Sequence, residues 1–364
     1  MTSSPPGLSQ LGFGFDDLSA PAPQAPARPR ARQRSAQAAP TPVVVPTVLE
    51  PVPPLLTFPP AVPDDALAQM ARTLDSHPDY RVLRRLDPPR SFPEPATGQT
   101  LRVLVLDTET TGLNATRDKV IELALLALDL DLATGQPTGP LVVYDGLEDP
   151  GAPLSPEVQQ LTGITDEMLQ GQRLDEARIA ELLAGAQLVI AHNAGFDRPF
   201  VEARLPAFAE VDWACSFADI DWKRQGRESA KLSALAMQLG WFYDAHRAEM
   251  DCHALLAVLS PTLPLGEVNG LMHLVQAARQ PSFRLQATAA PFEAKDLLKA
   301  RSYRWDAANR VWTTQLRDEA SLQDECLWLK SQVYGARPAR VQIERLDARQ
   351  RYSARPGSLD FRAL

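Results

Sequence analysis

The sequence is poor in cysteine: Cys215, Cys252 and Cys326 lie far apart among 364 residues and form no CxxC pair. Neither a disulfide framework nor a zinc site is therefore indicated, and this usage fits a reducing cytosol. The first residues lack the basic segment and apolar core of a signal peptide, and charges interrupt every longer apolar run. We expect a cytoplasmic protein without a membrane span.

Four carboxylates each stand beside an otherwise apolar segment: Asp107, Glu109, Asp197 and Asp251. The first two follow the apolar run 101–106, which is typical of a buried strand. Because side chains alternate along a strand, Asp107 and Glu109 point the same way. Burying like charges together is unfavourable unless cations neutralise them, so the pattern indicates a divalent metal site. A solvated turn would explain any one acidic pair alone.

The four acids occur in order within three separated motifs, and His246 lies five residues before the last acid. This set resembles the three exonuclease motifs of the DEDD superfamily, in the histidine-containing branch typified by the proofreading epsilon subunit of bacterial DNA polymerase III. The resemblance covers roughly residues 101–259 and departs at Thr162, where many relatives carry a histidine. It implies a ribonuclease H-like α/β fold and cleavage of phosphodiester bonds at a 3′ end.

The residue types of this set fit that chemistry. Two hard cations, Mg²⁺ or Mn²⁺, prefer oxygen ligands and can serve the attacking water and the leaving oxygen of a phosphodiester. We expect Asp107 to bridge two such ions, and Asp197 to act partly through a bound water. His246 is the candidate general base, because the pKa of histidine lies near working pH. On one helix, five residues turn through about 500°, which would point His246 and Asp251 apart, so His246 should precede the helix.

The turn after the first motif supplies the candidate substrate contacts. Thr110 and Gly112 could bring the backbone close to a terminal nucleotide, because glycine lacks the Cβ that would block the approach. Leu113 could press on the last base. In the family the corresponding positions read the 3′ end. The alternative is a strand-ending turn at Thr110 and Gly112, with Leu113 in ordinary core packing.

The composition divides the chain. Residues 1–63 contain 15 of the 33 prolines and predict a disordered arm. Within the arm, Gln10 to Leu18 loosely resembles the apolar peptides that dock on bacterial sliding clamps, so a clamp or a polymerase is a candidate partner. Residues 64–100 predict a helix, a strand-like appendage and a linker. Strands and helices then alternate over residues 101–264, the expected exonuclease domain.

Residues 279–364 predict a small basic α+β module, in which Trp305 and Trp312 either fill the core or stack on bases. This region carries 16 Lys and Arg against 10 Asp and Glu, a net charge of +6. Residues 101–264 carry 12 against 25, a net charge of −13. The module is therefore expected either to hold a nucleic acid backbone near the site or to pair with the acidic domain.

The sequence predicts a metal-dependent 3′–5′ exonuclease that acts on DNA in replication proofreading or DNA repair. An exoribonuclease resembling ribonuclease T or oligoribonuclease is the alternative, because the motifs do not read the sugar. A non-catalytic scaffold for replication or repair partners is a minor alternative. Such a scaffold has no need for all four acids and the histidine.

Overall fold

The computed structural model describes residues 64–94 and 98–364, so the expectations for residues 1–63 lie outside the described chain. The described residues fall into two units, of which one contains the helix α1 (Asp64–Asp75) and the other begins at Leu83. The helix confirms the prediction for this segment. Among the described residues, no helix combines the length and the apolar character that crossing a membrane requires.

The first of two large sheets has five strands in the order β4-β3-β2-β5-β6. Its strands are β2 (Thr100–Thr110), β3 (Val120–Asp131), β4 (Pro137–Leu147), β5 (Leu188–Ala191) and β6 (Asp212–Cys215). β2 pairs antiparallel with β3 and parallel with β5, so the sheet is mixed. β3 is buried almost throughout, as expected for a strand that is covered on both faces.

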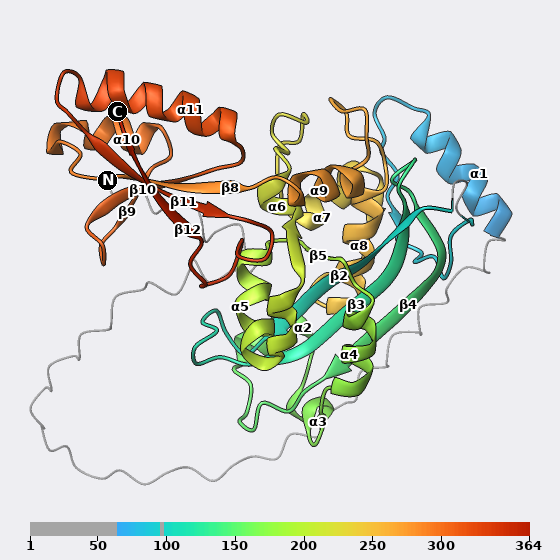
Figure 1. The fold of residues 1–364 in the computed structure, drawn as a ribbon. Helices are drawn as coiled ribbons and strands as arrows, with labels where there is room; N and C mark the ends of the chain where they lie inside the picture. Colours follow the sequence, from blue (N-terminus) through green and yellow to red (C-terminus); the bar gives the residue numbers. More distant parts are fainter. Residues whose placement is uncertain (1–63, 95–97) are drawn as a thin grey trace, which may run out of the picture. The chain divides into compact units, whose positions relative to one another are not determined.

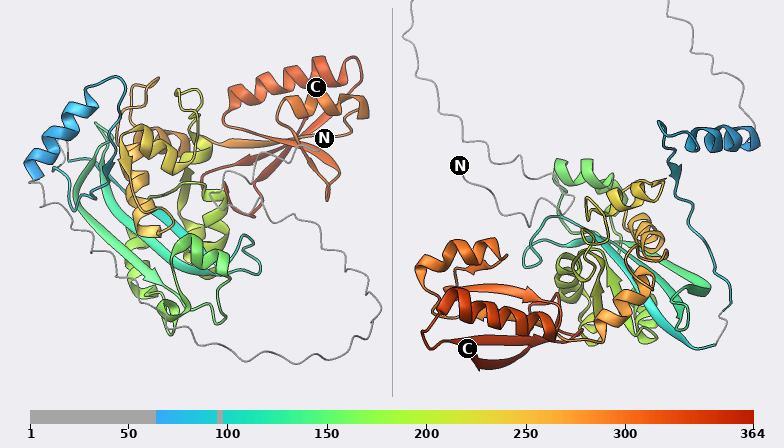
Figure 2. Two further views of the ribbon diagram at one scale, coloured as in Figure 1. Left: turned by 180° about the vertical axis from the view of Figure 1, so that it is seen from behind. Right: turned by 90° about the horizontal axis from the view of Figure 1, so that it is seen from above.

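Helices cover both faces of this sheet (Figure 1). The helices on the two faces are α7 (Leu232–Gln238), α8 (Ala248–Leu259) and α9 (Gly270–Ala278) on one, and α4 (Glu176–Ala184) and α5 (Ala194–Arg204) on the other. Val103 of β2 faces α8, whereas Leu104 faces the opposite layer. This arrangement, seen from two further sides in Figure 2, confirms the ribonuclease H-like α/β architecture.

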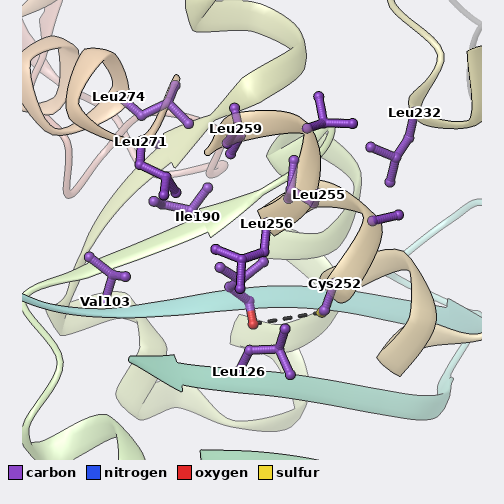
Figure 3. Close-up of a cluster of buried hydrophobic side chains, with 14 of the residues drawn as sticks. Val103, Leu126, Ile190, Leu232, Cys252, Leu255, Leu256, Leu259, Leu271 and Leu274 are labelled. Atoms are coloured by element: carbon purple, nitrogen blue, oxygen red, sulfur yellow. Dashed lines mark hydrogen bonds between the residues drawn. The ribbon is translucent and has the colours of Figure 1, made fainter. Parts of the chain in front are cut away.

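Close packing fixes α8 on the sheet. Leu255 and Leu256 lie against Val103 and Leu126, and the Cys252 thiol approaches the backbone carbonyl oxygens of β2 and β3 at 3.7 Å (Figure 3). A small side chain at this position lets the first turn of α8 come close to the strands. The start of α8 is thereby held beside the end of β2.

Short elements complete this part of the chain. They are β1 (Arg84–Arg85), α2 (Pro156–Thr162), α3 (Asp166–Leu169), the 3-10 helix Pro206–Glu210, α6 (Ser216–Asp219) and β7 (Trp241–Phe242). The Ser155 hydroxyl accepts from the Val158 N–H with Pro156 in the first turn, which confirms the predicted start of α2. β1 pairs with β7, so the strand expected near residues 80–86 is only two residues long.

The second large sheet has the order β12-β11-β8-β10-β9 and is antiparallel throughout. Its elements are β8 (Ser282–Ala287), the 3-10 turn Phe292–Ala294, α10 (Lys295–Ala300), β9 (Arg304–Asp306), β10 (Val311–Leu316), α11 (Glu319–Trp328), the π-helical turn Leu329–Tyr334, β11 (Arg340–Leu346) and β12 (Ser358–Ala363). The strands and helices of this region confirm the predicted α+β character. Trp312 packs against the core, and Trp305 contacts it edge to face while 49% exposed.

One buried arginine connects this module to the first sheet. The Arg198 guanidinium on α5 is fully buried and donates to the backbone carbonyls of Ala348 (3.1 Å), Arg349 (2.7 Å) and Arg351 (2.7 Å). It also stacks over Trp213 of β6. The turn that follows β11 is therefore bound by the helix that carries Asp197.

Ion pairs follow the same contact. Four module arginines pair with acids of the exonuclease region: Arg317 with Asp221, Arg349 with Asp212, Arg351 with Asp219 and Arg355 with Glu202, at 3.7, 3.5, 3.5 and 3.0 Å. Part of the positive charge of the module thus pairs with the acidic domain, which is one of the two roles expected from the sequence.

Candidate metal centre

Three of the predicted acids meet at the end of β2. Carboxylate oxygens of Asp107, Glu109 and Asp251 lie within 4.8 Å of one another. Asp107 and Glu109 continue the face of β2 that Val103 turns toward α8, and Asp251 stands in the first turn of that helix. Strand alternation and the position of α8 therefore bring together residues that are 142 and 144 positions apart in the chain.

Asp197 enters the same pocket from the first turn of α5. The pocket has a volume of ≈ 210 Å³ and is lined by all four acids and by His246. Thr108 points to the opposite side of β2 from its two acidic neighbours, and its hydroxyl donates to Asp197 Oδ1 at 2.8 Å. Thr108 thus orients the fourth acid, a role that no sequence pattern indicated.

The ionised carboxylates in this pocket repel one another. Burial, followed by the charges of Asp251 and Asp197, raises the pKa of Asp107 well above its usual range, and burial has the same effect on the pKa of Glu109. Burial also raises the pKa of Asp197 to about 7 and that of Asp251 to about 6. Burial and mutual repulsion favour the protonated forms of such an array, so bound cations would stabilise its ionised form.

The donor set fits hard divalent cations. The buried oxygen Oε2 of Glu109 has no hydrogen-bond partner among the described residues. An orphaned carboxylate oxygen beside two further carboxylates offers the oxygen ligands that Mg²⁺ and Mn²⁺ prefer. The residues present are therefore compatible with the predicted metal site.

His246 lies in the loop before α8, as the spacing argument predicted. Its backbone adopts φ 65°, which is uncommon for a residue with a side chain, and its N–H donates to Asp251 Oδ2 at 2.7 Å. The Tyr243 hydroxyl donates to the other oxygen of Asp251 at 2.8 Å. Burial lowers the pKa of His246, so its imidazole is neutral and can accept a proton.

A buried ion pair stabilises the start of α8 beside the metal centre. Glu122 of β3 lies opposite Glu109 in the sheet register and is fully buried. It accepts from the Arg247 guanidinium at 2.7 Å and from the Ala248 N–H at 2.9 Å. Glu122 therefore holds the start of α8 and the residue after His246. Sequence reasoning missed it, although a lone acid inside the apolar run 120–128 was a signal.

Further residues line the wall of the pocket: His192, Asn193, Phe196, Lys231, Ser233 and Tyr243. His192 was expected to have only a structural role at a strand end. Its Nδ1 lies 2.6 Å from Ser216 Oγ, and burial lowers the pKa of its imidazole to about 4. Phe196 lies at the pocket and against Phe200.

The predicted substrate contacts form a tight turn and do not line the pocket itself. The buried Thr110 hydroxyl donates to the Gly112 carbonyl at 2.6 Å. A Cβ on Gly112 would lie 2.5 Å from the Asp118 carboxylate, so a larger residue here would displace that side chain. Leu113 is 40% exposed, which argues against core packing. The role of these three residues in substrate binding stays a prediction.

Thr162, which stands where many relatives carry a histidine, is buried, and its hydroxyl donates to the Val158 carbonyl of its own helix.

Residues 104–259 match the exonuclease family. The chain carries an exonuclease domain. It is 29% identical over 192 residues to the DNA polymerase III subunit epsilon of Treponema pallidum, covering 49% of this chain and 83% of that relative. It is also 39% identical over 101 residues to the PolC-type DNA polymerase III of Halalkalibacterium halodurans, covering 27% of this chain but 6% of that relative. The domain makes this protein a nuclease of the hydrolase class.

Among solved structures, exonuclease X in complex with 5′ overhanging duplex DNA is similar to this chain. The sequence identity is 25%, the TM-score is 0.34, and the similarity covers 43% of this chain and 88% of that chain.

Proposed function

We propose that the protein is a metal-dependent 3′–5′ exonuclease that hydrolyses phosphodiester bonds at the 3′ end of DNA, in replication proofreading or repair. The observation that carries this proposal is the convergence of four acids and a neutral histidine on one pocket inside an exonuclease domain. The relative from Treponema pallidum is named as a polymerase subunit, which favours DNA over RNA. A polymerase or clamp partner is part of the same proposal.

The four acids would hold two Mg²⁺ or Mn²⁺ ions. Asp107, Glu109 and Asp251 supply the oxygens that lie closest together, and Asp197 supplies a fourth carboxylate in the same pocket. The ions would contribute positive charge near the attacking and the leaving oxygen. Without that charge, the pocket repels the phosphate of a substrate, since all four acids face it.

His246 would accept the proton of the attacking water at its imidazole. Two features of the chain support this role: burial keeps the imidazole neutral, and the bond from its own N–H to Asp251 fixes its loop. Tyr243 and Thr108 would act by positioning Asp251 and Asp197, since their hydroxyls bond to those carboxylates. Phe196 is placed at the pocket wall, where a terminal nucleotide would rest.

The central test is the Asp107→Asn variant assayed on single-stranded DNA labelled at its 5′ end, with Mg²⁺ or Mn²⁺. The wild-type protein should produce a ladder that shortens from the 3′ end, and EDTA should stop it. The variant should lose about 10³-fold or more of the rate, because the acids act as a unit. Glu181→Gln, which neutralises an exposed acid on α4, is the matched control and should keep full activity.

Three results would contradict the proposal. Undiminished activity of the Asp107→Asn variant would remove the metal centre from the chemistry. Shortening from the 5′ end would reverse the proposed polarity. Faster cleavage of a matched RNA oligonucleotide would favour the exoribonuclease alternative.

A further inference from the structure

The module sheet has two unlike faces. Phe283, Leu285 and Ala287 of β8 pack on one face with residues of α10 and α11. Both helices lie on this same side of the sheet (Figure 1). Because side chains alternate along a strand, Arg284 and Gln286 lie on the opposite face, and neither is buried. We call that opposite surface the outer face.

One row of residues crosses all five strands on the outer face. The register of the sheet places directly beside one another Arg304, Thr313, Gln286, Gln342 and Phe361. Neighbouring strands are about 4.8 Å apart, so the row is about 19 Å long. The row contains no acid, and Phe361 at its end is 49% exposed.

On this face Asp306, which pairs with Val311 and lies two residues from Arg304, accepts from the N–H groups of Ala308 and Asn309. The neighbouring row on the side of Arg284 adds little negative charge. It consists of Gln315, Arg284, Glu344 and Leu359. Its one acid, Glu344, is buried and accepts from the Arg284 guanidinium at 2.7 Å. The two rows together therefore present arginine, amide and apolar groups to the solvent.

An arginine stands beside the exposed ring. The Arg340 guanidinium lies over Phe361, 5.0 Å from the ring centroid. Arg340 pairs with Ala363, so it is the diagonal neighbour of Phe361 on the same face. A nucleobase can stack on an exposed aromatic ring while a guanidinium contacts the adjacent phosphate, and glutamine amides can donate to and accept from base edges. The tryptophans do not take part, because Trp305 and Trp312 share the face of Ala287.

We propose that the outer face binds single-stranded DNA, with a base stacked on Phe361 and phosphates held by Arg340 and Arg304. The inference rests on the proposed function for the identity of this occupant. Charge favours the same assignment, because residues 279–364 carry a net +6 and residues 101–264 a net −13. The module attracts a backbone that the exonuclease region outside its metal centre repels.

The test measures binding by the full chain with fluorescence anisotropy, using a labelled oligo-dT of about 20 nucleotides in EDTA, so that cleavage does not interfere. Phe361→Ala should weaken binding about tenfold, which corresponds to the loss of one stacked base. Phe361→Leu, which keeps an apolar side chain, should show the same loss, and Phe361→Trp should retain the affinity. Leu327→Ala is the matched control, because Leu327 is 65% exposed on α11, and it should bind like wild type.

The basic residues have a test of their own. Arg304→Gln and Arg340→Gln should each reduce the slope of log affinity against log salt by about one. Lys330→Gln removes one positive charge from the π-helical turn Leu329–Tyr334 and should leave the slope unchanged.

Equal affinities for the Phe361→Leu, Leu327→Ala and wild-type proteins would overturn the proposal, as would equal salt slopes for all three basic variants. The outcome is separable from that of the nuclease assay. A protein that binds through Phe361 but does not cleave DNA would refute only the proposed function. A protein that cleaves DNA but whose binding is indifferent to Phe361 would refute only the outer face as a binding surface.

Discussion

The regions around the two five-stranded sheets differ in how the charge of their buried acids is balanced. In the first sheet both faces are covered, β3 is buried almost throughout, and four acids share one pocket at the end of β2. In the second sheet one face is covered, burial alternates along β8, and the buried acid Glu344 is paired with Arg284. Acids that share a pocket need a cation, whereas a paired acid is already neutralised.

This difference distinguishes the candidate metal centre from charged residues that have a structural role. Raised pKa values of Asp107, Glu109, Asp197 and Asp251 show that the fold holds these acids against their own repulsion. Stability alone does not account for such an arrangement, and perturbed acids in a pocket mark functional chemistry. The charged groups of the second sheet act instead through partners or at the surface.

The largest effect on stability should come from Arg198, which tests whether the two regions can be separated at all. Arg198→Met leaves the carbonyls of Ala348, Arg349 and Arg351 without their donor. We expect the free energy of unfolding, measured by urea denaturation, to fall by about 3–5 kcal/mol. Arg178→Met, which breaks a surface pair on α4, should change it by less than about 1 kcal/mol. Equal effects would show that the turn after β11 does not depend on Arg198.

Replacing His246 tests the effect of the first region on activity. His246→Ala should lower kcat by about 10²-fold or more, because the proton of the attacking water loses its acceptor. Metal affinity, measured by calorimetry, should change little, since the imidazole is not one of the proposed ligands. His77→Ala, which alters an exposed histidine, serves as the control. Weakened metal binding with normal kcat at saturating metal would assign His246 a structural role.

Neutralising one buried acid should have opposite signs in the two regions, at Asp197 of α5 and at Glu344 of β11. Burial raises the folded-state pKa of Asp197 to about 7, so the folded protein loses stability as the pH rises from the unfolded-state pKa of about 3.9, and this loss is complete above about pH 7. In EDTA at about pH 8, Asp197→Asn should therefore raise the free energy of unfolding by about 1–3 kcal/mol, while Thr108 keeps an acceptor. Glu344→Gln should lower it, because Arg284 loses its partner. Changes of the same sign in both variants would contradict the distinction between the sheets.

His192 provides the smallest effect and a pH dependence. Its folded-state pKa is lowered to about 4, against about 6.5 in the unfolded chain. As the pH falls below the unfolded value, the unfolded state takes up the proton first, so the wild-type protein loses stability. His192→Gln cannot titrate, and the stability difference between the two proteins should shift by about 2 kcal/mol from pH 7 to pH 5. The titrating acids are common to both proteins and cancel in this difference. Parallel pH curves would show that His192 is not desolvated.

Local patterns and the resemblance to the DEDD exonucleases together singled out the four acids and His246. Each acid stands beside an apolar segment, and the periodicity of a helix predicted that His246 lies in the loop before α8. The same patterns predicted α1, α2 and the hairpin of β9 and β10, whose signals lie within a few residues of one another. β11 and β12 were not predicted, although the alternation of polar and apolar residues in β11 is a strand signal.

The sequence by itself determined which residues we propose for the chemistry, because metal ligands and a proton acceptor must be particular residue types at fixed local spacings. Only the tertiary structure decided which residues hold these side chains in place. Glu122 lies beside Glu109 through strand register, Thr108 meets Asp197 across a strand end, and Arg198 binds a turn about 150 residues away. Each of these partners is defined by distance in space, and a charged or hydroxyl residue in a helix or strand reads as a surface residue until packing shows what surrounds it.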